Sequence, residues 1–348
     1  MKILLVHNFY RQPGGEDAVF EVERDLLRDA GHEVCEYVRR NEEIGDDGIW
    51  SKLSAGLRAT WAWDSAAELR RILQYEKPAL AHFHNTFPLI SPAAYYECRA
   101  AGLPVVQTLH NYRLVCPAAT LSREDHLCEE CIQHSLWRAV RHGCYRDSRA
   151  ASAAAAVMLA AHRSLRTWTR LVDCYVVPSL FARDKFIEAG LPTEKIFVKP
   201  NFVSPDPGIR SGQGEYALFV GRVLPEKGLN TLLKAWNLLR DGIPLRIIGD
   251  GPLLADLKCG ALRDCLSGVS FEGARTRAET IAAMKSARLL IFPSEWYETF
   301  GRVIAEAFAC GVPVVASRLG AMRELVEDGR TGLHFTPGDA ADLAAKIA

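Results

Sequence analysis

The sequence predicts an α/β protein of two domains, each built on a parallel β-sheet. Short apolar segments typical of buried strands alternate with segments whose apolar residues recur at helical spacing, and this alternation is typical of parallel α/β architecture. A loop over residues 200–214, rich in proline, glycine and serine, divides the pattern into two sets. The length of 348 residues also fits two domains of roughly 150–200 residues each.

The first set of elements begins at the N-terminus. An apolar run over residues 2–6 predicts a buried strand, and Gly14 and Gly15 follow it in a turn. Residues 18–30 place their apolar side chains on one helical face, and Gly31 stands where a helix end favours a left-handed residue. Further strands are expected at 32–38, 79–82, 104–109 and 174–177, and further helices at 66–75 and 183–189.

The second set follows the central loop. The final helical pattern, over residues 340–348, has no cap. Strand and helix patterns on both sides of the loop indicate two Rossmann-like domains, over residues 1–203 and 204–348. In the second domain we expect strands at 216–220, 245–248, 289–292 and 312–316, and a helix at 229–240.

Composition and charge narrow the class of protein. Hydrophobic residues make up 49% of the chain and charged residues 24%, which is typical of a soluble globular protein. The 42 basic and 42 acidic residues cancel, so no overall charge favours a nucleic-acid partner. The apolar run at residues 3–6 is too short for a signal peptide, and no stretch approaches the ~18 apolar residues of a membrane span. We therefore expect a cytoplasmic protein that binds no nucleic acid.

Two glutamates mark a candidate site in the second domain. Glu298 and Glu306 stand eight residues apart, and Phe300 and Gly301 lie between them at a probable helix start. If Glu298 belongs to the preceding loop, both carboxylates can face one cleft, and the helix start offers free amides to a phosphate. On spacing alone, an exposed glutamate beside a partly buried one explains the pattern equally well.

Two cations belong to the same candidate site. Arg222 directly follows a predicted strand, and Lys227 precedes the next helix. Open α/β sheets bind ligands at the carboxyl ends of their strands, so both cations are placed where an anionic ligand would lie. The alternative is a pair of solvated surface charges.

Several segments together resemble the glycosyltransferases of family 4, also described as glycosyl transferases group 1. They are GRVLPEKGLNTLLKAW, IIGDGP, PSEWYETFGRVIAEAFACGVPVVAS and GRTGLHF, in this order, with PGGEDAVFEVERDLLRDAGHEV and TLHNY in the first domain. The resemblance covers essentially the whole chain. It implies the GT-B fold, in which two Rossmann-like domains face a central cleft. Residues 1–203 would lie on the acceptor side, and residues 204–348 would bind a nucleotide sugar. In this fold the C-terminal helix usually crosses back onto the first domain, so the resemblance implies that the second domain is truncated.

The resemblance also implies roles for individual positions. Two cations would hold the pyrophosphate of the donor, one glutamate its sugar hydroxyls, the second glutamate the ribose, and a histidine would lie beside the anomeric centre. The implied catalytic residues are His110, Arg222, Lys227 and Glu298. The implied donor-binding residues are Gly14, Gly15, Arg222, Lys227, Glu298, Phe300, Gly301 and Glu306. His7 and His84 also end predicted strands, and we leave both outside the catalytic set.

By the same resemblance, the protein is expected to be a retaining hexosyltransferase. It would move a sugar from a nucleotide donor to a glycan or lipid-linked acceptor in polysaccharide or glycoconjugate biosynthesis. Cations and helix amides would stabilise the charge of the leaving diphosphate, and no divalent ion is expected in catalysis. The alternatives are a sugar-nucleotide epimerase or phosphorylase of the same fold, and a non-catalytic protein that binds nucleotide sugars.

Four cysteines in the first domain have the spacing of metal ligands. Cys116, Cys128, Cys131 and Cys144 form the pattern C-x11-C-x2-C-x12-C inside an insertion over about residues 114–146. The central CxxC can place two thiolates on one metal, and the outer cysteines can complete a tetrahedral structural zinc site. The alternatives are four reduced cysteines or a redox pair. A similar cysteine-bearing insertion occurs in a subset of bacterial family members.

Two basic segments suggest contact with an anionic membrane. Residues 49–63 interleave Trp50, Trp61 and Trp63 with Lys52 and Arg58. Basic aromatic stretches bind anionic lipid surfaces, so we expect peripheral contact with the inner face of the cell membrane. A solvated arginine face is the alternative. Residues 132–170 carry one acid, Asp147, against seven arginines: Arg138, Arg141, Arg146, Arg149, Arg163, Arg166 and Arg170.

Overall fold

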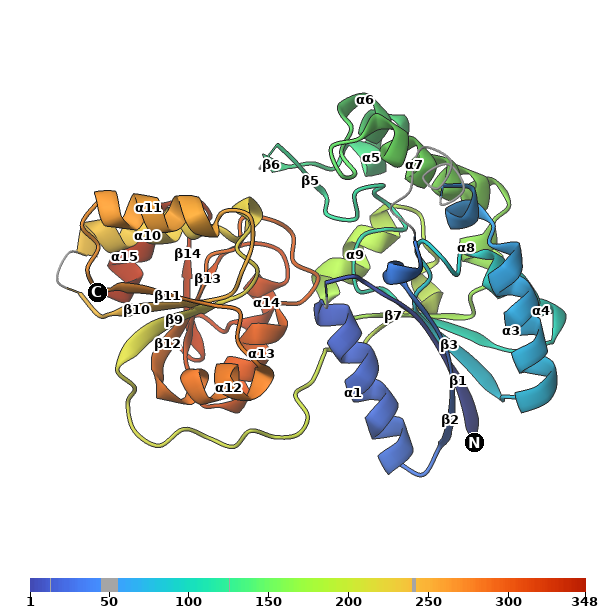
Figure 1. Ribbon diagram of the computed structural model, residues 1–348, viewed down its shortest axis with the longest axis horizontal. Helices are drawn as coiled ribbons and strands as arrows, with labels where there is room; N and C mark the ends of the chain where they lie inside the picture. Colours follow the sequence, from blue (N-terminus) through green and yellow to red (C-terminus); the bar gives the residue numbers. More distant parts are fainter. Residues whose placement is uncertain (13, 45–55, 125, 240–241) are drawn as a thin grey trace. The chain divides into compact units, whose positions relative to one another are not determined.

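The computed structural model describes residues 1–348 except 13, 45–55, 125 and 240–241 (Figure 1). The chain divides into two compact units. The first comprises residues 1–121 and 128–200, and the second comprises residues 201–348 with the segment 122–127. Each unit contains a six-stranded parallel sheet with helices, which confirms the predicted α/β class.

The first unit is built on a sheet with the strand order β2-β1-β3-β4-β7-β8. Every side chain of β1 from Ile3 to Asn8 is buried, and Ile3 to Val6 form the continuous apolar run typical of a strand covered on both faces. Phe20 of α1 packs on Ile3 and Leu5. The strands are β1 (Lys2–Phe9), β2 (Glu33–Arg40), β3 (Leu80–Asn85), β4 (Val105–Thr108), β7 (Cys174–Val177) and β8 (Ile196–Val198).

Helices cover this sheet and form the segment between β4 and β7. The alanine-rich helix α7 begins after Ser148, whose hydroxyl caps the amide of Ala151 at 3.2 Å. The helices are α1 (Gly15–Asp29), α3 (Trp63–Glu76), α4 (Ala93–Ala100), α5 (Glu130–Gln133), α6 (Trp137–His142), α7 (Arg149–Ser164), α8 (Thr167–Arg170) and α9 (Leu180–Glu188). This part of the chain also contains two 3₁₀ turns, Asn41–Glu43 and Thr193–Lys195, and a small hairpin, β5 (Ser122–Arg123) with β6 (His126–Leu127).

The second unit has the strand order β11-β10-β9-β12-β13-β14. Alternate residues of β9 point to opposite faces, so that Ala217 and Phe219 pack beneath α10, α11 and α15, while Leu218 packs with α12, α13 and α14 (Figure 1). The strands are β9 (Tyr216–Val220), β10 (Leu245–Ile248), β11 (Val269–Gly273), β12 (Ala287–Phe292), β13 (Val314–Ser317) and β14 (Gly332–Phe335). The helices are a 3₁₀ turn (Pro225–Lys227), α10 (Leu229–Leu239), α11 (Leu254–Arg263), α12 (Arg277–Ser286), α13 (Arg302–Ala309), α14 (Met322–Leu325) and α15 (Ala340–Ile347).

The observed elements differ from the expected ones at the strand ends and in elements that were not predicted, among them the helices α4, α7, α11 and α12. β1 continues to Phe9 rather than residue 6, and β3 continues to Asn85 rather than residue 82. The edge strands β11 and β14 and the short strand β8 were not predicted.

The tryptophan-rich segment is described only from residue 56 onward, so the prediction for Trp50 and Lys52 lies outside the described residues. In the described part of the chain, no helix combines the length and the apolar character that a membrane crossing requires.

Close backbone contacts leave room only for glycine at three positions of the second unit. A Cβ on Gly249 would lie 1.8 Å from the carbonyl oxygen of Gly221, and one on Gly251 would lie 2.3 Å from that of Val223. Gly228, with φ +70°, would place a Cβ 1.9 Å from the carbonyl oxygen of Pro293. These glycines let the loops that follow β9, β10 and β12 lie backbone against backbone.

We expect Gly228→Ala to lower the free energy of unfolding by at least about 4 kcal/mol, because the added methyl group collides with rigid backbone. Gly273→Ala is the matched control, since Gly273 has φ +72° but open space around its Cβ. The control should cost only about 1–2 kcal/mol of conformational strain. Urea unfolding of both variants measures the difference, and equal losses would contradict the close contact.

Candidate functional site

The loops after β9 and β12 meet in the second unit at the point where the strand order reverses. β9 lies between β10 and β12, so the chain leaves β9 toward one side of the sheet and β12 toward the other. The amide of Glu295 donates to the carbonyl of Glu226 at 2.8 Å, which joins the two loops. A reversal of this kind leaves a crevice at the carboxyl ends of the strands, where α/β proteins bind ligands.

A buried ion pair between Lys227 and Glu298 lies at this junction. The side chains are only 15% and 12% exposed, and the Lys227 ammonium also lies 4.9 Å from the ring centroid of Trp296. Ser294 donates its hydroxyl to Glu298 Oε1 at 2.8 Å. Burial acts to raise the pKa of Glu298, but the charge and hydrogen bond of Lys227 outweigh it and lower that pKa below its usual value. Glu298 is therefore a carboxylate at neutral pH.

Arg222 lies in the loop directly after β9, and its side chain is exposed. This loop is held against the loop after β10 by a hydrogen bond from the Val223 amide to the Asp250 carbonyl at 2.8 Å. The close approach of Gly249 and Gly251 belongs to the same contact. The IIGDGP segment thus supports the backbone that carries Arg222.

Helix α13 supplies the remaining predicted residues of this unit. Gly301, with φ +91°, is its N-cap, and Phe300 before it is buried. Glu306 is buried within the helix and is paired one turn away with Arg302, whose Nη2 lies 3.0 Å from Oε1. All six residues predicted in this unit (Arg222, Lys227, Glu298, Phe300, Gly301 and Glu306) belong to the loops after β9 and β12 or to α13.

The first unit carries a histidine cluster at the carboxyl ends of its strands. His84 on β3 shares a 3.0 Å hydrogen bond with His110, which follows β4, and the two rings stack with centroids 5.2 Å apart. His7 on β1 lies 2.7 Å from Asp17 of α1 and stacks on Phe20. The sheet order reverses between β1 and β3, so this cluster occupies the corresponding switch point of the first unit.

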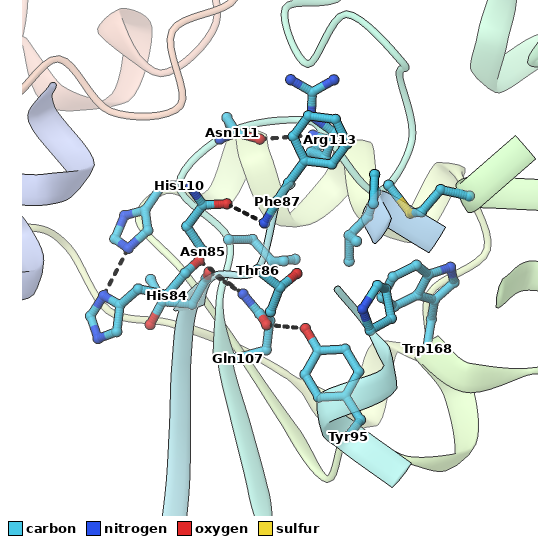
Figure 2. A pocket seen from close by; sticks show the side chains of 16 residues that line it. His84, Asn85, Thr86, Phe87, Tyr95, Gln107, His110, Asn111, Arg113 and Trp168 are labelled. Carbon is cyan, nitrogen blue, oxygen red and sulfur yellow. Dashed lines mark hydrogen bonds between the residues drawn. The ribbon is translucent and has the colours of Figure 1, made fainter. Parts of the chain in front are cut away.

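A pocket adjoins the two stacked histidines (Figure 2). Figure 2 shows the His84 and His110 rings on one side and Trp168 on the other, with Tyr95 hydrogen-bonded to Gln107 at its floor. Gln107 also donates to the carbonyl of His84 at 3.1 Å and so fixes the strand that carries this histidine. The pocket is lined by both polar and aromatic groups, as binding pockets for small ligands commonly are.

Burial keeps these imidazoles neutral. Desolvation lowers the pKa of His110 and of His84 well below the usual value, and neighbouring histidines lower both further. It also lowers the pKa of His82 to about 4. A neutral imidazole can donate one hydrogen bond and accept another, but it carries no charge at neutral pH.

The predicted glycines lie at the start of α1. Gly14 is the N-cap of this helix, and its amide donates to Asp17 Oδ2 at 2.7 Å. Gly15 begins the helix, and a Cβ on it would meet nothing within 4 Å. Burial raises the pKa of the neighbouring Glu16, which accepts a hydrogen bond from Asn111 at 2.9 Å.

Sequence reasoning missed several buried polar groups around His110. His82 and Glu23 were not singled out, and His84 was left outside the catalytic set although it contacts His110 directly. One signal was available. His82 and His84 stand two residues apart in a strand, so their side chains lie on the same face of the sheet.

The four cysteines of the predicted zinc site are all reduced in the structure, and two of them meet. The thiols of Cys116 and Cys131 are hydrogen-bonded, and this bond lowers the pKa of Cys116 below the usual value of a thiol. Across the described residues, no three of the four sulfur atoms lie within 4.8 Å of one another. The zinc site therefore stays a prediction.

The two parallel sheets with their covering helices are those of the GT-B fold of glycosyltransferases. Residues 14–207 match Glycosyltransferase Family 4, and residues 206–348 match Glycosyl transferases group 1. The chain belongs to glycosyltransferase family 4, as its motifs predicted.

Named relatives share parts of the chain. The 2-deoxystreptamine glucosyltransferase of Streptomyces kanamyceticus is 30% identical over 258 residues, which is 72% of this chain and 62% of the relative. The sulfoquinovosyl transferase SQD2 of Arabidopsis thaliana is 31% identical over 201 residues, 53% of this chain and 38% of the relative. The phosphatidyl-myo-inositol mannosyltransferase of Mycobacterium tuberculosis is 38% identical over 137 residues, 38% of this chain and 35% of the relative. Each match spans less than two thirds of the relative's own length.

Solved structures agree with the fold. Anabaena Alr3699/HepE in complex with UDP superposes with a TM-score of 0.67 at 22% identity, covering 100% of this chain and 89% of that one. Sucrose-phosphate synthase from Thermosynechococcus elongatus gives a TM-score of 0.69 at 17% identity, covering 99% and 88%.

We expect Lys227→Met to lower the free energy of unfolding by about 3 kcal/mol at neutral pH, because it leaves a buried carboxylate without its cation. The stabilisation by the native pair is present above the ordinary glutamate pKa of about 4.3 and is lost as pH falls through the lower pKa of folded Glu298. In the variant, burial of Glu298 is no longer opposed by the charge of Lys227, and protonation relieves the unpaired charge. The difference in stability should therefore narrow from about pH 7 to about pH 4.5.

Urea unfolding at both pH values measures this difference. The double variant Lys227→Met/Glu298→Gln is the control, because it removes both charges and should lose less stability than Lys227→Met alone. A difference that stays constant with pH would contradict the assigned pair.

Proposed function

We propose that this protein is a retaining glycosyltransferase that moves a sugar from a nucleoside diphosphate donor to a glycan or lipid-linked acceptor. The observation that carries the proposal is the junction of the loops after β9 and β12, where Lys227 and Glu298 lie together at the strand reversal. Cations beside carboxylates suit a ligand that joins a pyrophosphate to a sugar. Membership in family 4 supports the reaction class, and a structural neighbour has been solved with UDP-glucose.

The donor half of the mechanism follows from charge. Breaking the bond between the anomeric carbon and the phosphate oxygen leaves negative charge on the diphosphate and positive charge on the sugar. Arg222 and Lys227 stabilise the leaving diphosphate, and the amides of Phe300 and Gly301 at the start of α13 add to this. Glu298 holds sugar hydroxyls, and Glu306 holds the ribose. Because Lys227 and Glu298 pair with each other here, donor binding separates them and gives each a new partner.

The acceptor half rests on the first unit. His110 lies beside the pocket of Figure 2, and His84 fixes its ring by a hydrogen bond and by stacking. A neutral His110 can hydrogen-bond a sugar hydroxyl without introducing charge beside a cationic transition state. Gly14 and Gly15, the N-cap and first residue of α1, are proposed to bind the donor phosphates. In this proposal no protein side chain forms a covalent bond to the sugar, and catalysis uses no divalent ion.

We also propose that the acceptor lies at a membrane surface. The seven arginines of residues 132–170 all have exposed side chains, and Trp137 and Leu165, which are 54% exposed, lie among them in sequence. Exposed cations with apolar residues bind anionic lipid surfaces. One relative is named a phosphatidyl-myo-inositol mannosyltransferase, which supports a lipid acceptor. In this proposal the protein is cytoplasmic and in peripheral contact with the inner face of the cell membrane.

A structural zinc at Cys116, Cys128, Cys131 and Cys144 is a further proposal. The contact between the Cys116 and Cys131 thiols supports it, because two of the four sulfurs already meet. A fully occupied set of four thiolates would leave no open position on the metal and would stabilise the segment that carries it.

We expect one class of donor among UDP-, GDP-, ADP- and dTDP-sugars to raise the melting temperature of the protein. Arg222→Ala should abolish this shift, because it removes a cation from the diphosphate. Arg263→Ala is the matched control, since Arg263 is an exposed arginine on α11. A shift that survives Arg222→Ala would place the nucleotide elsewhere.

With that donor, Glu298→Gln should reduce sugar transfer by roughly 100-fold or more, by analogy with the loss of one preorganised polar group in other active sites. NMR of the product should show retained anomeric configuration. Conversion of the donor without an acceptor would indicate an epimerase, and donor binding without any turnover would indicate a non-catalytic binding protein. An unchanged rate of sugar transfer in Glu298→Gln would contradict the proposed role of Glu298 in holding the donor sugar.

We expect the protein to float with anionic liposomes and not with neutral ones. The variant Arg138→Ala/Arg141→Ala/Arg149→Ala should weaken binding roughly 100-fold, at about 1 kcal/mol per cation. The control replaces three exposed arginines of the second unit, Arg263, Arg323 and Arg330. An equal loss of liposome binding in both triple variants would contradict this surface. Liposome binding that does not weaken as the salt concentration rises would contradict it too.

A further inference from the structure

Three side chains beneath the histidine pair form a second cluster. Glu23 lies on α1, and His82 and His84 lie on β3. One potential ligand atom from each lies within 4.8 Å of the others, and the described residues contain no second group of three histidine, cysteine or acidic side chains that meets this condition. None of the three belongs to the residues proposed to bind the donor.

The contacts within the cluster are too long for hydrogen bonds. His84 Nε2 lies 3.7 Å and His82 Nδ1 lies 4.0 Å from the same atom, Glu23 Oε2. His84 Nε2 is buried and has no hydrogen-bond partner among the described residues. An unpartnered buried nitrogen that faces a carboxylate oxygen is unfavourable, unless something between them bonds to both.

A metal ion has the size that these separations require. Two ligands about 2.0–2.1 Å from a tetrahedral zinc are about 3.3–3.4 Å apart. The two nitrogen-to-oxygen separations exceed that value by about 0.3–0.7 Å, and all three atoms lie within 4.8 Å of one another. Side-chain rotations would bring the three atoms to bonding distance. Two imidazoles and one carboxylate are a ligand set for zinc and for other divalent first-row metals.

The outward-facing ring atoms are already fixed. His82 Nε2 lies 2.7 Å from Thr108 Oγ1, and His84 Nδ1 lies 3.0 Å from His110 Nε2. Metal-bound histidines almost always have their second nitrogen hydrogen-bonded in this way, which fixes the ring orientation and the tautomer. The remaining nitrogens, His82 Nδ1 and His84 Nε2, are the two that face Glu23.

Lys199 limits how Glu23 can bind. Its ammonium pairs with Glu23 Oε1, the oxygen that does not face the histidines. Glu23 can therefore offer Oε2 as a single ligand while Oε1 stays with the lysine. Because the Lys199 side chain is 44% exposed, it can also move into water when a cation enters.

We propose that Glu23, His82 and His84 bind a divalent transition metal, with zinc as the reference ion and a fourth position left for water. The metal has a positioning role. With its Nε2 on the metal, His84 must carry its proton on Nδ1 and donate it to His110 Nε2. His110 is then held as the neutral tautomer protonated on Nδ1. The site is distinct from the four cysteines, and it stands whether or not the protein transfers sugar.

The test is zinc titration of the chelator-treated full chain by calorimetry, with zinc content measured after gel filtration. We expect His82→Gln to lose one bound zinc per chain and Cys128→Ser/Cys131→Ser to retain that zinc. His142→Gln is the matched control, because His142 is an exposed histidine of the same unit. Cobalt bound in the double cysteine variant should show no thiolate charge-transfer absorption.

Two milder variants keep the test decisive if His82→Gln fails to fold. Thr108→Val removes the partner of His82 and should weaken zinc binding about 10- to 100-fold. Lys199→Gln should tighten it, because it removes a competing cation from Glu23. Equal zinc content in the wild type and His82→Gln, or no change in zinc affinity for both Thr108→Val and Lys199→Gln, would overturn the proposal.

Discussion

The reversal of strand order in each parallel sheet is the constraint on which the rest of the structure depends. At the reversal, neighbouring strands send their following loops to opposite faces, so nothing covers the carboxyl ends between them. In the second unit this point lies between β9 and β12, and it holds Lys227 and Glu298. In the first unit it lies between β1 and β3, and it holds His7 and His84. The polar side chains of this protein gather at both reversals because the backbone leaves room for them there.

Part of the fold could be predicted, and the two strands β1 and β3 run longer than expected for one shared reason. The expected bounds of the strands at 174–177, 216–220 and 245–248 match the structure, because these strands end where their apolar runs end. β1 and β3 run on through His7 and Asn8 and through His84 and Asn85, all of them buried at the carboxyl end of the sheet. A strand predicted from its apolar residues ends before these polar residues, and they are the ones that belong to the candidate site.

The positions of the site residues along the chain could be predicted, but the contacts between their side chains could not. Arg222 and Glu298 were predicted as site residues from the strands and the helix that flank them and from the motifs of the family. The ion pair of Lys227 with Glu298 joins residues 71 positions apart, and the contact of His84 with His110 joins two different strand ends. Such pairings depend on strand order, which the sequence pattern did not define. For the same reason Glu23 of α1 gave no sign that it lies against His82 and His84 of β3.

A common electrostatic arrangement links the two units. Each places a buried carboxylate against one lysine: Glu298 against Lys227, and Glu23 against Lys199. A buried charge that loses its partner is strongly destabilising, so a ligand that engages one member must leave the other compensated. A sugar diphosphate meets this condition at Lys227, because it brings its own negative charge and offers hydroxyls to Glu298. A divalent cation meets it at Glu23, because it replaces the charge of Lys199. In both units the lysine compensates the buried carboxylate until a bound ligand takes over that compensation.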